Sequence, residues 1–270
     1  MLVNESPHIA RLTAPNPSLM TGRGTNTYLL GAHDVAVIDP GPDDEQHITA
    51  ILEAITALGG QLAVILVTHS HLDHLPGAFL LQQRVRVPIA AFAPILGVDL
   101  PLRHDQRLAI DGHPLRALHT PGHAADHLCF LLEEERVLFS GDLIVGEGTV
   151  VIGRDGELDE YLQSLASLLP LDLRRILPGH GPAIDDPPAK IAAYIAHRAE
   201  RERQIVAALA AGFDTIQEIV AEIYAGVDRR LYPVAAQTVD AHLRKLVRDD
   251  RVVAIAVVSG PTRYELVAER

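Results

Sequence analysis

The chain has 270 residues, which is enough for one large domain and a small one, so we expect a domain boundary late in the sequence. No apolar run approaches the roughly 20 residues that a membrane-spanning helix needs, and the first residues lack the basic and apolar regions of a signal peptide. A single cysteine, Cys129, excludes an internal disulfide. These features predict a protein of the reducing cytoplasm that does not associate with membranes.

Histidine is abundant and the charge is strongly negative. The sequence has 14 histidines against one cysteine, so a metal site in this chain would be built from nitrogen and oxygen ligands. The formal net charge of −12 opposes long-range attraction of nucleic acid, although a local basic patch can still bind it. The overall charge therefore counts against a polyanionic substrate.

The first elements alternate between strands and a helix. Short apolar runs at 27–30 and 35–38 predict a hairpin. Asp43 and Asp44 stand where an N-cap and a first-turn acid belong in an amphipathic helix that ends at Gly59. The apolar run 62–67 has the length of a strand and predicts one that is covered on both faces. A cluster of histidines begins immediately after this strand.

The same alternation continues to about residue 178. We expect a helix at 75–83, strands at 87–92, 115–118, 128–132 and 137–139, a helix at 158–169 and a strand at 175–177. Strands mixed with helices predict a layered α/β architecture, of the α/β or α+β class, in which helices cover the sheets.

The composition changes from about residue 187. Helical spacing at 191–210, 215–223 and 234–247, followed by a hairpin over 251–258 and 263–267, predicts a winged helix. We therefore divide the chain into domains at 1–190 and 191–270. The second carries eleven basic and eleven acidic residues, whereas the first carries twelve basic and twenty-four acidic ones, so the whole negative charge belongs to the first.

The segment 68–74 reads T-H-S-H-L-D-H and places three imidazoles and one carboxylate directly after the buried strand. Loops at strand ends commonly carry functional side chains. So many polar groups would be costly to bury together, but a divalent cation offsets that cost by coordinating them. A solvated polar loop is the alternative. We predict that the segment binds metal.

This segment resembles the metallo-β-lactamase superfamily, whose T-H-x-H-x-D-H loop it matches at each fixed position. Four further elements of that superfamily occur in order: V-I-D-P-G at 37–41, T-P-G-H at 120–123, S-G-D at 140–142 and P-G-H-G-P at 178–182. Together with G-T-N-T-Y-L at 24–29 and the winged helix, they look like the lactamase-beta-2-like group. The resemblance implies a four-layer αββα sandwich followed by the small winged-helix domain.

Carried over by position, the resemblance implies two metal ions. His69, His71 and His123 would hold the first ion. Asp73, His74 and His180 would hold the second, and Asp142 would bridge the two. The expected metal is zinc, with iron or manganese as alternatives because nitrogen and oxygen ligands discriminate poorly among these ions.

Three further roles are expected around these ligands. Asp73 is also expected to take part in catalysis, and its replacement is expected to abolish hydrolysis. His127 follows His123 by four residues and is expected to support the site by hydrogen bonding. Asp39 has two interpretations, a similar supporting role or an ordinary turn-forming role.

The expected activity is that of a dinuclear zinc hydrolase. Zinc can lower the pKa of bound water from 15.7 to about 7, so a metal-bridging hydroxide would attack an ester, thioester, lactone or phosphodiester. The expected partner is a small ester- or thioester-type substrate. One alternative is an endoribonuclease that acts on single-stranded RNA, as some members of the lactamase-beta-2-like group do.

A second alternative is a nucleic-acid-binding protein that uses the winged helix. Its basic residues lie on or near the third helix and in the wing: His242, Arg244, Lys245, Arg248, Arg251 and Arg263. Asp240, Asp249 and Asp250 interrupt this patch, so we do not expect DNA recognition. We expect the domain instead to pack on the catalytic domain, to shape one wall of the pocket, or to form a homodimer.

Overall fold

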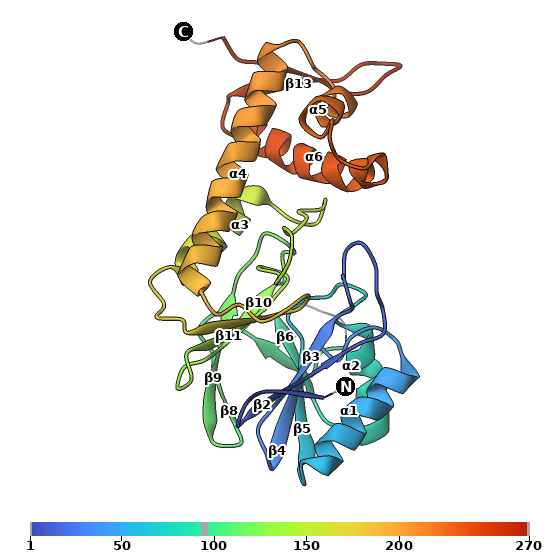
Figure 1. The fold of residues 1–270 in the computed structure, drawn as a ribbon, viewed down its shortest axis with the longest axis vertical. Coiled ribbons are helices and arrows are strands. Elements are labelled where there is room, and N and C mark those ends of the chain that lie inside the picture. Colours follow the sequence, from blue (N-terminus) through green and yellow to red (C-terminus); the bar gives the residue numbers. More distant parts are fainter. Residues whose placement is uncertain (1, 93–96, 269–270) are drawn as a thin grey trace.

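The computed structural model describes residues 2–92 and 97–268 and shows a larger N-terminal domain with a smaller, mainly helical domain above it (Figure 1). The larger domain has a seven-stranded sheet in the order β1-β2-β3-β4-β5-β6-β7. Its strands are β1 Val3–Ser6, β2 Ile9–Thr13, β3 Asn26–Leu30, β4 Asp34–Ile38, β5 Gln61–Leu66, β6 Ile89–Phe92 and β7 Leu100–Leu102.

A five-stranded sheet in the order β12-β11-β10-β9-β8 faces the first. Its strands are β8 Arg107–Ile110, β9 His113–His119, β10 Leu128–Leu132, β11 Val137–Gly141 and β12 Arg175–Pro178. The helices of this domain and the helix that leaves it are α1 Glu45–Ala57, α2 Pro76–Val85, α3 Leu158–Leu168 and α4 Pro187–Ala210.

Three hydrophobic cores separate four layers of structure. Helices α1 and α2 pack on the outer face of the larger sheet, where Ile51 and Leu81 meet Ile65. The two sheets pack face to face through a second core that includes Phe130 and Phe139. Helix α3 and the first half of α4 cover the outer face of the smaller sheet in the third core. The predicted αββα sandwich is confirmed.

The helices and strands follow the predicted order closely. Asp44 caps α1 by accepting a hydrogen bond from the backbone N–H of His47 at 2.7 Å, as an N-cap residue does. Strand β5 lies between β4 and β6 and runs parallel to both. Four strands were not predicted, namely β1, β2, β7 and β8. Strands β1, β7 and β8 are sheet edges, and β7 and β8 are largely exposed, so they lack the continuous apolar run that marks the central strands.

The C-terminal domain contains α5 Ile216–Ile223, the 3₁₀ turn η1 Arg229–Leu231, α6 Tyr232–Arg248 and the hairpin of β13 Val252–Ile255 with β14 Arg263–Leu266. These elements enclose a separate core with the second half of α4. The winged helix is therefore present as predicted. The division between residues 190 and 191 stays a prediction, since α4 runs through it without a break. Within the described ranges, no helix is long and apolar enough to cross a membrane.

Stability should depend on pH through His47, a buried residue of α1. Its Nε2 lies 2.8 Å from the Thr27 hydroxyl, and burial lowers the pKa of His47 from 6.5 to about 4. Between these values the unfolded chain binds a proton that the folded chain does not, so folding stability falls as the pH falls. We expect the wild type to lose about 3 kcal/mol more than His47→Gln between pH 6.5 and pH 4.

Urea unfolding of both proteins across this range, with chelator present, measures the difference. The other histidines titrate alike in the two proteins, so only the difference between them reports on His47. Parallel curves of unfolding free energy against pH would show that the imidazole is not held in its neutral form.

Candidate metal centre

The loop 68–74 is fixed by Asp39, which follows β4 in a left-handed backbone conformation with φ 50°. The Asp39 carboxylate accepts hydrogen bonds from the backbone N–H of Thr68 at 2.8 Å and from its hydroxyl at 2.7 Å. One oxygen of the same carboxylate lies 2.8 Å from Nδ1 of His74. Asp39 therefore turns the chain and also contacts a histidine of the centre, so its geometry suits both of the roles that the sequence left open, and its supporting role stays a prediction.

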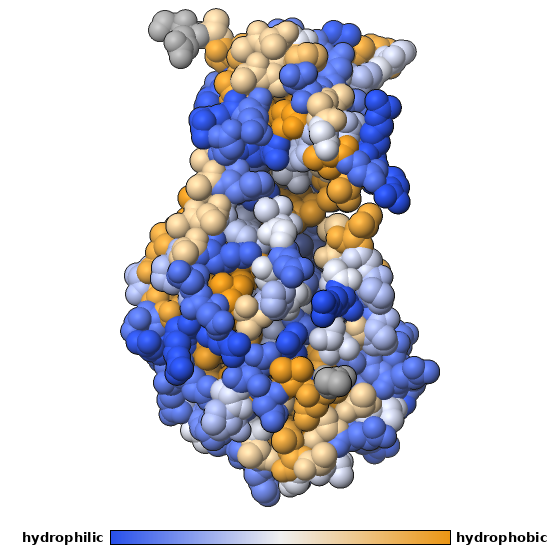
Figure 2. Space-filling view, viewed as in Figure 1, coloured by the Kyte–Doolittle hydropathy of each residue, from blue (hydrophilic) through white to orange (hydrophobic). Residues whose placement is uncertain are grey.

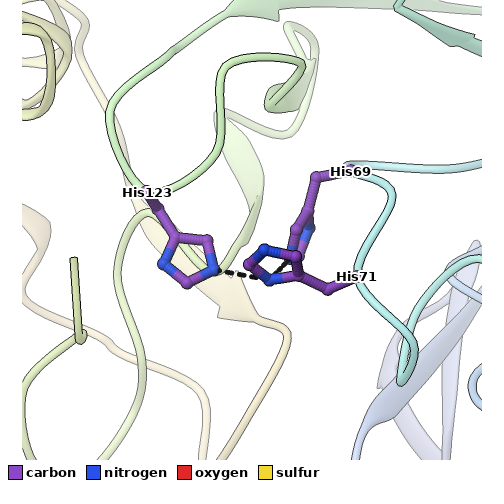
Figure 3. A group of neighbouring side chains, drawn as sticks. All are labelled: His69, His71 and His123. Atoms are coloured by element: carbon purple, nitrogen blue, oxygen red, sulfur yellow. Dashed lines mark hydrogen bonds between the residues drawn. The ribbon is translucent and has the colours of Figure 1, made fainter. Parts of the chain in front are cut away.

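Three histidines converge on one point (Figure 3). His69 and His71 come from the loop after β5, and His123 comes from the loop after β9. Nδ1 of His71 lies 3.0 Å from Nε2 of His69 and 3.0 Å from Nε2 of His123. The ring nitrogens of residues distant in sequence thus face one another at the end of the two sheets.

The outer nitrogen of His69 carries its proton. The Thr68 hydroxyl uses its own hydrogen to donate to Asp39, so at 3.0 Å it can only accept from Nδ1 of His69. A neutral imidazole then presents a lone pair at Nε2. Burial holds the pKa of His69 well below its usual range, which keeps the ring neutral.

The other two rings are oriented in the same manner. Nδ1 of His123 donates to the carbonyl of Val151 at 2.9 Å, and Nε2 of His71 faces the carboxylate of Asp155 at 2.8 Å. A carbonyl and a carboxylate only accept, so each ring holds its proton on this outer side. Three lone pairs therefore meet at the centre with no hydrogen to share, which is the arrangement that a cation satisfies.

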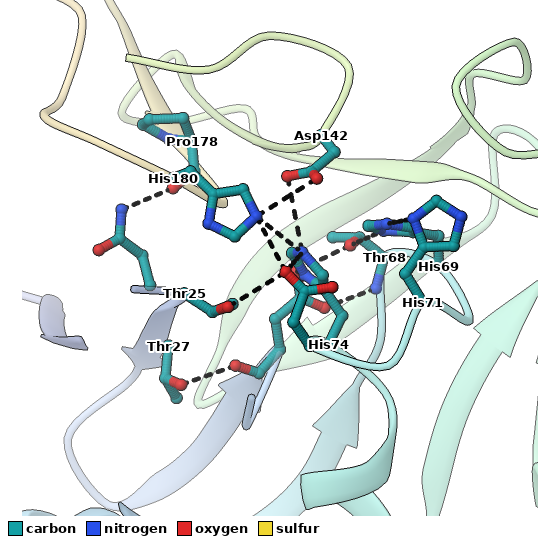
Figure 4. Close-up of polar contacts among 12 residues, drawn as sticks. Thr25, Thr27, Thr68, His69, His71, His74, Asp142, Pro178 and His180 are labelled. Atoms are coloured by element: carbon teal, nitrogen blue, oxygen red, sulfur yellow. Dashed lines mark hydrogen bonds and ion pairs between the residues drawn. The ribbon is translucent and has the colours of Figure 1, made fainter. Parts of the chain in front are cut away.

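A second group lies beside the first (Figure 4). Nε2 of His180 is 3.1 Å from Oδ2 of Asp73 and 3.4 Å from Nε2 of His74. The outer nitrogens again face acceptors, because Nδ1 of His74 lies against Asp39 and Nδ1 of His180 is 3.3 Å from the carbonyl of Gly24. The inner Nε2 atoms of His74 and His180 therefore point at one place together with the Asp73 carboxylate, and each would offer a lone pair to an ion that displaces its proton.

Asp142 lies between the two groups. Its Oδ2 is 3.3 Å from Nε2 of His180 and 3.7 Å from Nε2 of His123, and its Oδ1 is 3.5 Å from Nε2 of His74. Within the part of the chain that the structure describes, the buried Oδ1 has no hydrogen-bond partner. An unpartnered buried carboxylate oxygen among imidazoles fits a bridging metal ligand.

The structure thus brings together all seven residues predicted as ligands. Three combinations place one ligand atom from each residue within 4.8 Å of the others: His69 with His71 and His123, His69 with His74 and Asp142, and Asp73 with His74 and His180. Five imidazole nitrogens and two carboxylates match the donors that zinc takes in proteins. The residues present therefore fit divalent metal ions, and their role as ligands stays a prediction.

Charges within the centre compensate one another. Burial opposes the charged form of His180, but the carboxylates of Asp142 and Asp73 outweigh it and raise the pKa of His180 to about 9. Burial likewise opposes the ionised form of Asp73, but the hydrogen bond from His180 and the positive charge of His74 lower its pKa to about 2. Asp73 is therefore a carboxylate at neutral pH.

Two residues outside the predicted ligand set contact the centre. Nε2 of His127 accepts the backbone N–H of Asp142 at 3.1 Å, and the supporting role of His127 stays a prediction. Asp155 was not predicted at all, although it contacts His71. It lies 84 residues from His71 in a glycine-rich loop, and no motif marks it.

The basic residues of the winged helix face acidic groups of the same chain. Arg244 pairs with Glu157 at 2.7 Å, and Arg248 pairs with Asp159 at 2.9 Å, which ties α6 to the start of α3. The remaining pairs are Lys245 with Glu202 and Asp249, Arg251 with Glu202, and Arg263 with Asp214. His242 is buried.

Comparison with known proteins agrees with this architecture. The family model of the metallo-beta-lactamase superfamily matches residues 20–180, and that of the beta-lactamase associated winged helix domain matches residues 215–257. The chain belongs to the metallo-β-lactamase superfamily. It is a hydrolase of that superfamily with a C-terminal winged helix, and the superfamily generally binds metal ions.

Curated relatives cover nearly the whole chain. A Beta-lactamase-like protein 2 homolog from Drosophila melanogaster is 36% identical over 264 residues, which cover 90% of this chain and 89% of that protein. An Atrochrysone carboxyl ACP thioesterase from Aspergillus chevalieri is 32% identical over 277 residues, which cover 98% of this chain and 89% of that protein.

Two solved structures share the complete fold. A metallo-beta-lactamase family protein from Thermus thermophilus has a TM-score of 0.81 at 25% identity, with 97% of this chain and 99% of that chain covered. A Beta-lactamase domain protein from Burkholderia ambifaria has a TM-score of 0.87 at 21% identity, with 98% and 93% covered. Both likenesses extend over both domains.

Proposed function

We propose that the chain is a dinuclear zinc hydrolase that cleaves thioesters. The observation that carries the metal proposal is the convergence of five imidazole nitrogens and two carboxylates, with the outer nitrogen of each of the five histidines facing an acceptor. When bound, divalent ions supply Lewis acidity toward the scissile carbonyl and lower the pKa of a coordinated water.

The chain's own residues prepare the site for that chemistry. The Asp39, Asp155 and Val151 acceptors hold imidazoles in the ligating tautomer, so no reorientation is needed at the moment of reaction. Asp73 stays ionised, and its side chain remains 28% exposed, so we assign it the catalytic task of orienting the attacking water. This water adds to the carbonyl carbon, the C–S bond breaks, and the released sulfur takes the proton.

Three observations favour a thioester over a polyanion. Relatives of this chain include proteins named as carboxyl ACP thioesterases. The domain that holds the centre carries the whole net charge of −12, which repels phosphate chains. Leu72 lies within the metal-binding loop and is 83% exposed, and Leu19 and Met20, in the loop before Thr25, are 76% and 54% exposed, which suits an acyl group.

The surface is hollowed between the two domains, and hydrophobic residues gather where the loop between β2 and β3 approaches the C-terminal domain (Figure 2). We propose that the acyl part of the substrate lies in this hollow. The pairing of the winged helix's arginines with Glu157 and Asp159 leaves them poorly placed to contact RNA or DNA phosphates, so the nucleic-acid alternatives lack a supporting observation.

The proposal is tested by assaying the purified, metal-loaded protein on thioesters, esters, lactones, phosphodiesters and single-stranded RNA. Metal analysis should give about two zinc ions per chain, and iron or manganese at the same number would change the metal but not the mechanism. We expect thioesters to have the highest kcat/KM. His71→Ala should abolish turnover, whereas His104→Ala, at an exposed surface position, should not. Turnover by metal-free protein, or RNA as the preferred substrate, would contradict the proposal.

A further inference from the structure

The loop at 145–157 runs beside the metal centre, and side chains of the last two long helices hold its carbonyl groups. From α4, Lys190 donates to the carbonyl of Gly146 at 3.0 Å, the Tyr194 hydroxyl lies 3.1 Å from that of Gly148, and buried Arg198 donates to that of Val150. These contacts fix the first half of the loop. They leave the glycine-rich second half, 153–156, to be held from elsewhere.

Arg244 of α6 holds that second half. Its guanidinium donates to the carbonyl of Gly153 at 2.9 Å, to that of Gly156 at 3.1 Å and to the Glu157 carboxylate at 2.7 Å. A guanidinium presents several donors in one plane, so a single side chain can fix both ends of a short segment. Asp155 is inside the segment that Arg244 closes.

The Asp155 carboxylate in turn contacts the metal centre. Its Oδ2 lies 2.8 Å from Nε2 of His71, on the side of the ring opposite the nitrogen that faces His69 and His123. The Asp155 side chain is 59% exposed, and an exposed pair of this kind contributes little when its members are free to move. The contact between Asp155 and His71 therefore depends on the side chains that hold the loop at 145–157 in place.

We propose that Asp155 is a positioning residue that fixes the His71 ring for metal binding, and that Arg244 of the winged-helix domain holds Asp155 in place. This inference rests on the proposed metal site. A carboxylate on the outer nitrogen of a ligating imidazole fixes its tautomer and raises its basicity. The third helix of the winged helix, which reads DNA in other proteins, here completes the surroundings of a metal ligand.

The test compares four single variants: Asp155→Ala, Asp155→Asn, Arg244→Met and the matched control Arg248→Met. Arg248 lies one turn further along the same helix and pairs with Glu157 and Asp159, so its removal reports on domain contact alone. Zinc affinity is measured by competition with a chromophoric chelator, and melting temperature is measured on the same samples.

We expect Asp155→Ala to weaken binding of one of the two ions by about 10- to 100-fold. Asp155→Asn, which keeps an acceptor, should weaken it less. Arg244→Met should weaken the same ion, and the double variant Asp155→Ala with Arg244→Met should be no weaker than Asp155→Ala, because both act through one contact. Arg248→Met should bind both ions as the wild type does.

The results separate this inference from the proposed function. A wild type that binds no metal would contradict the proposed function itself. A wild type that binds two ions, with Asp155→Ala equal to it in affinity, would overturn the positioning role alone. If Arg244→Met and Arg248→Met weakened zinc binding equally, Arg244 would act only by joining the two domains. That result would overturn the proposal that Arg244 holds Asp155 in place.

Discussion

Replacing Asp142 with alanine is expected to lower kcat/KM by about a thousandfold or more. Asp142 is the carboxylate that lies within 3.3 to 3.7 Å of imidazoles from both groups, so its loss removes the ligand that the two ions would share. Metal polarisation of a reacting oxygen is worth several kcal/mol, and each 1.36 kcal/mol is a factor of ten in rate. Steady-state kinetics on the best substrate, together with zinc content per chain, measures the effect.

The matched control is Asp172→Ala. Asp172 is 81% exposed and pairs with Arg136 at the surface, so its removal deletes a carboxylate without touching the centre. Without metal, Asp142→Ala should melt below the wild type because His180 loses a counter-charge, but in a single cooperative transition, which excludes misfolding as the cause of lost activity. An Asp142→Ala protein with two ions and more than a tenth of wild-type activity would rule out the bridging role.

Gly122→Ala is expected to lower the free energy of unfolding by about 2 to 6 kcal/mol. Gly122 has φ +128°, and a Cβ atom there would lie 2.2 Å from the backbone nitrogen of Tyr161 and 2.3 Å from its Cα. The neighbouring atoms belong to the backbone of α3 and cannot rotate away. Unfavourable backbone conformation and overpacking each cost about 1 to 3 kcal/mol. Urea unfolding of the metal-free protein measures the change.

Gly59→Ala separates the two costs. Gly59 has φ +76°, but among the described residues no atom lies within 4 Å of the Cβ that alanine would add. It should therefore show only the conformational cost of the left-handed backbone, about 1 to 2 kcal/mol. If Gly122→Ala lost no more stability than Gly59→Ala, close approach of α3 would not be the reason for glycine in the T-P-G-H element.

The sequence predicted the central elements and the candidate ligands for different physical reasons. Buried strands such as β5 are continuous apolar runs, and α1 repeats its apolar residues at helical spacing, so a local window contains the whole signal. The loop at 68–74 concentrates four polar ligands in seven residues. Asp142 and His180 carry no such local signal and were predicted only through the order of the superfamily's elements.

What the sequence did not predict depends on contacts between distant segments. Asp155 is positioned by a loop that side chains of α4 and α6 hold. From the sequence, Arg244 was a candidate contact to nucleic-acid phosphates, but in the structure it donates to the carbonyls of Gly153 and Gly156. Edge strands such as β7 are short and include Pro101, so their pairing depends on the neighbour. A hydrogen bond between residues that are distant in sequence produces no repeating pattern in the sequence around either residue.

Helix α4 belongs to two cores at once. Ile191 and Tyr194 pack in the core outside the smaller sheet, whereas Ile205 and Leu209 pack in the core of the winged helix, and 24 residues of unbroken helix join them. A continuous helix shared by two cores couples them more closely than a flexible linker between independent units does. We therefore expect the two domains to unfold together, so that a ligand bound at the metal centre also stabilises the winged helix.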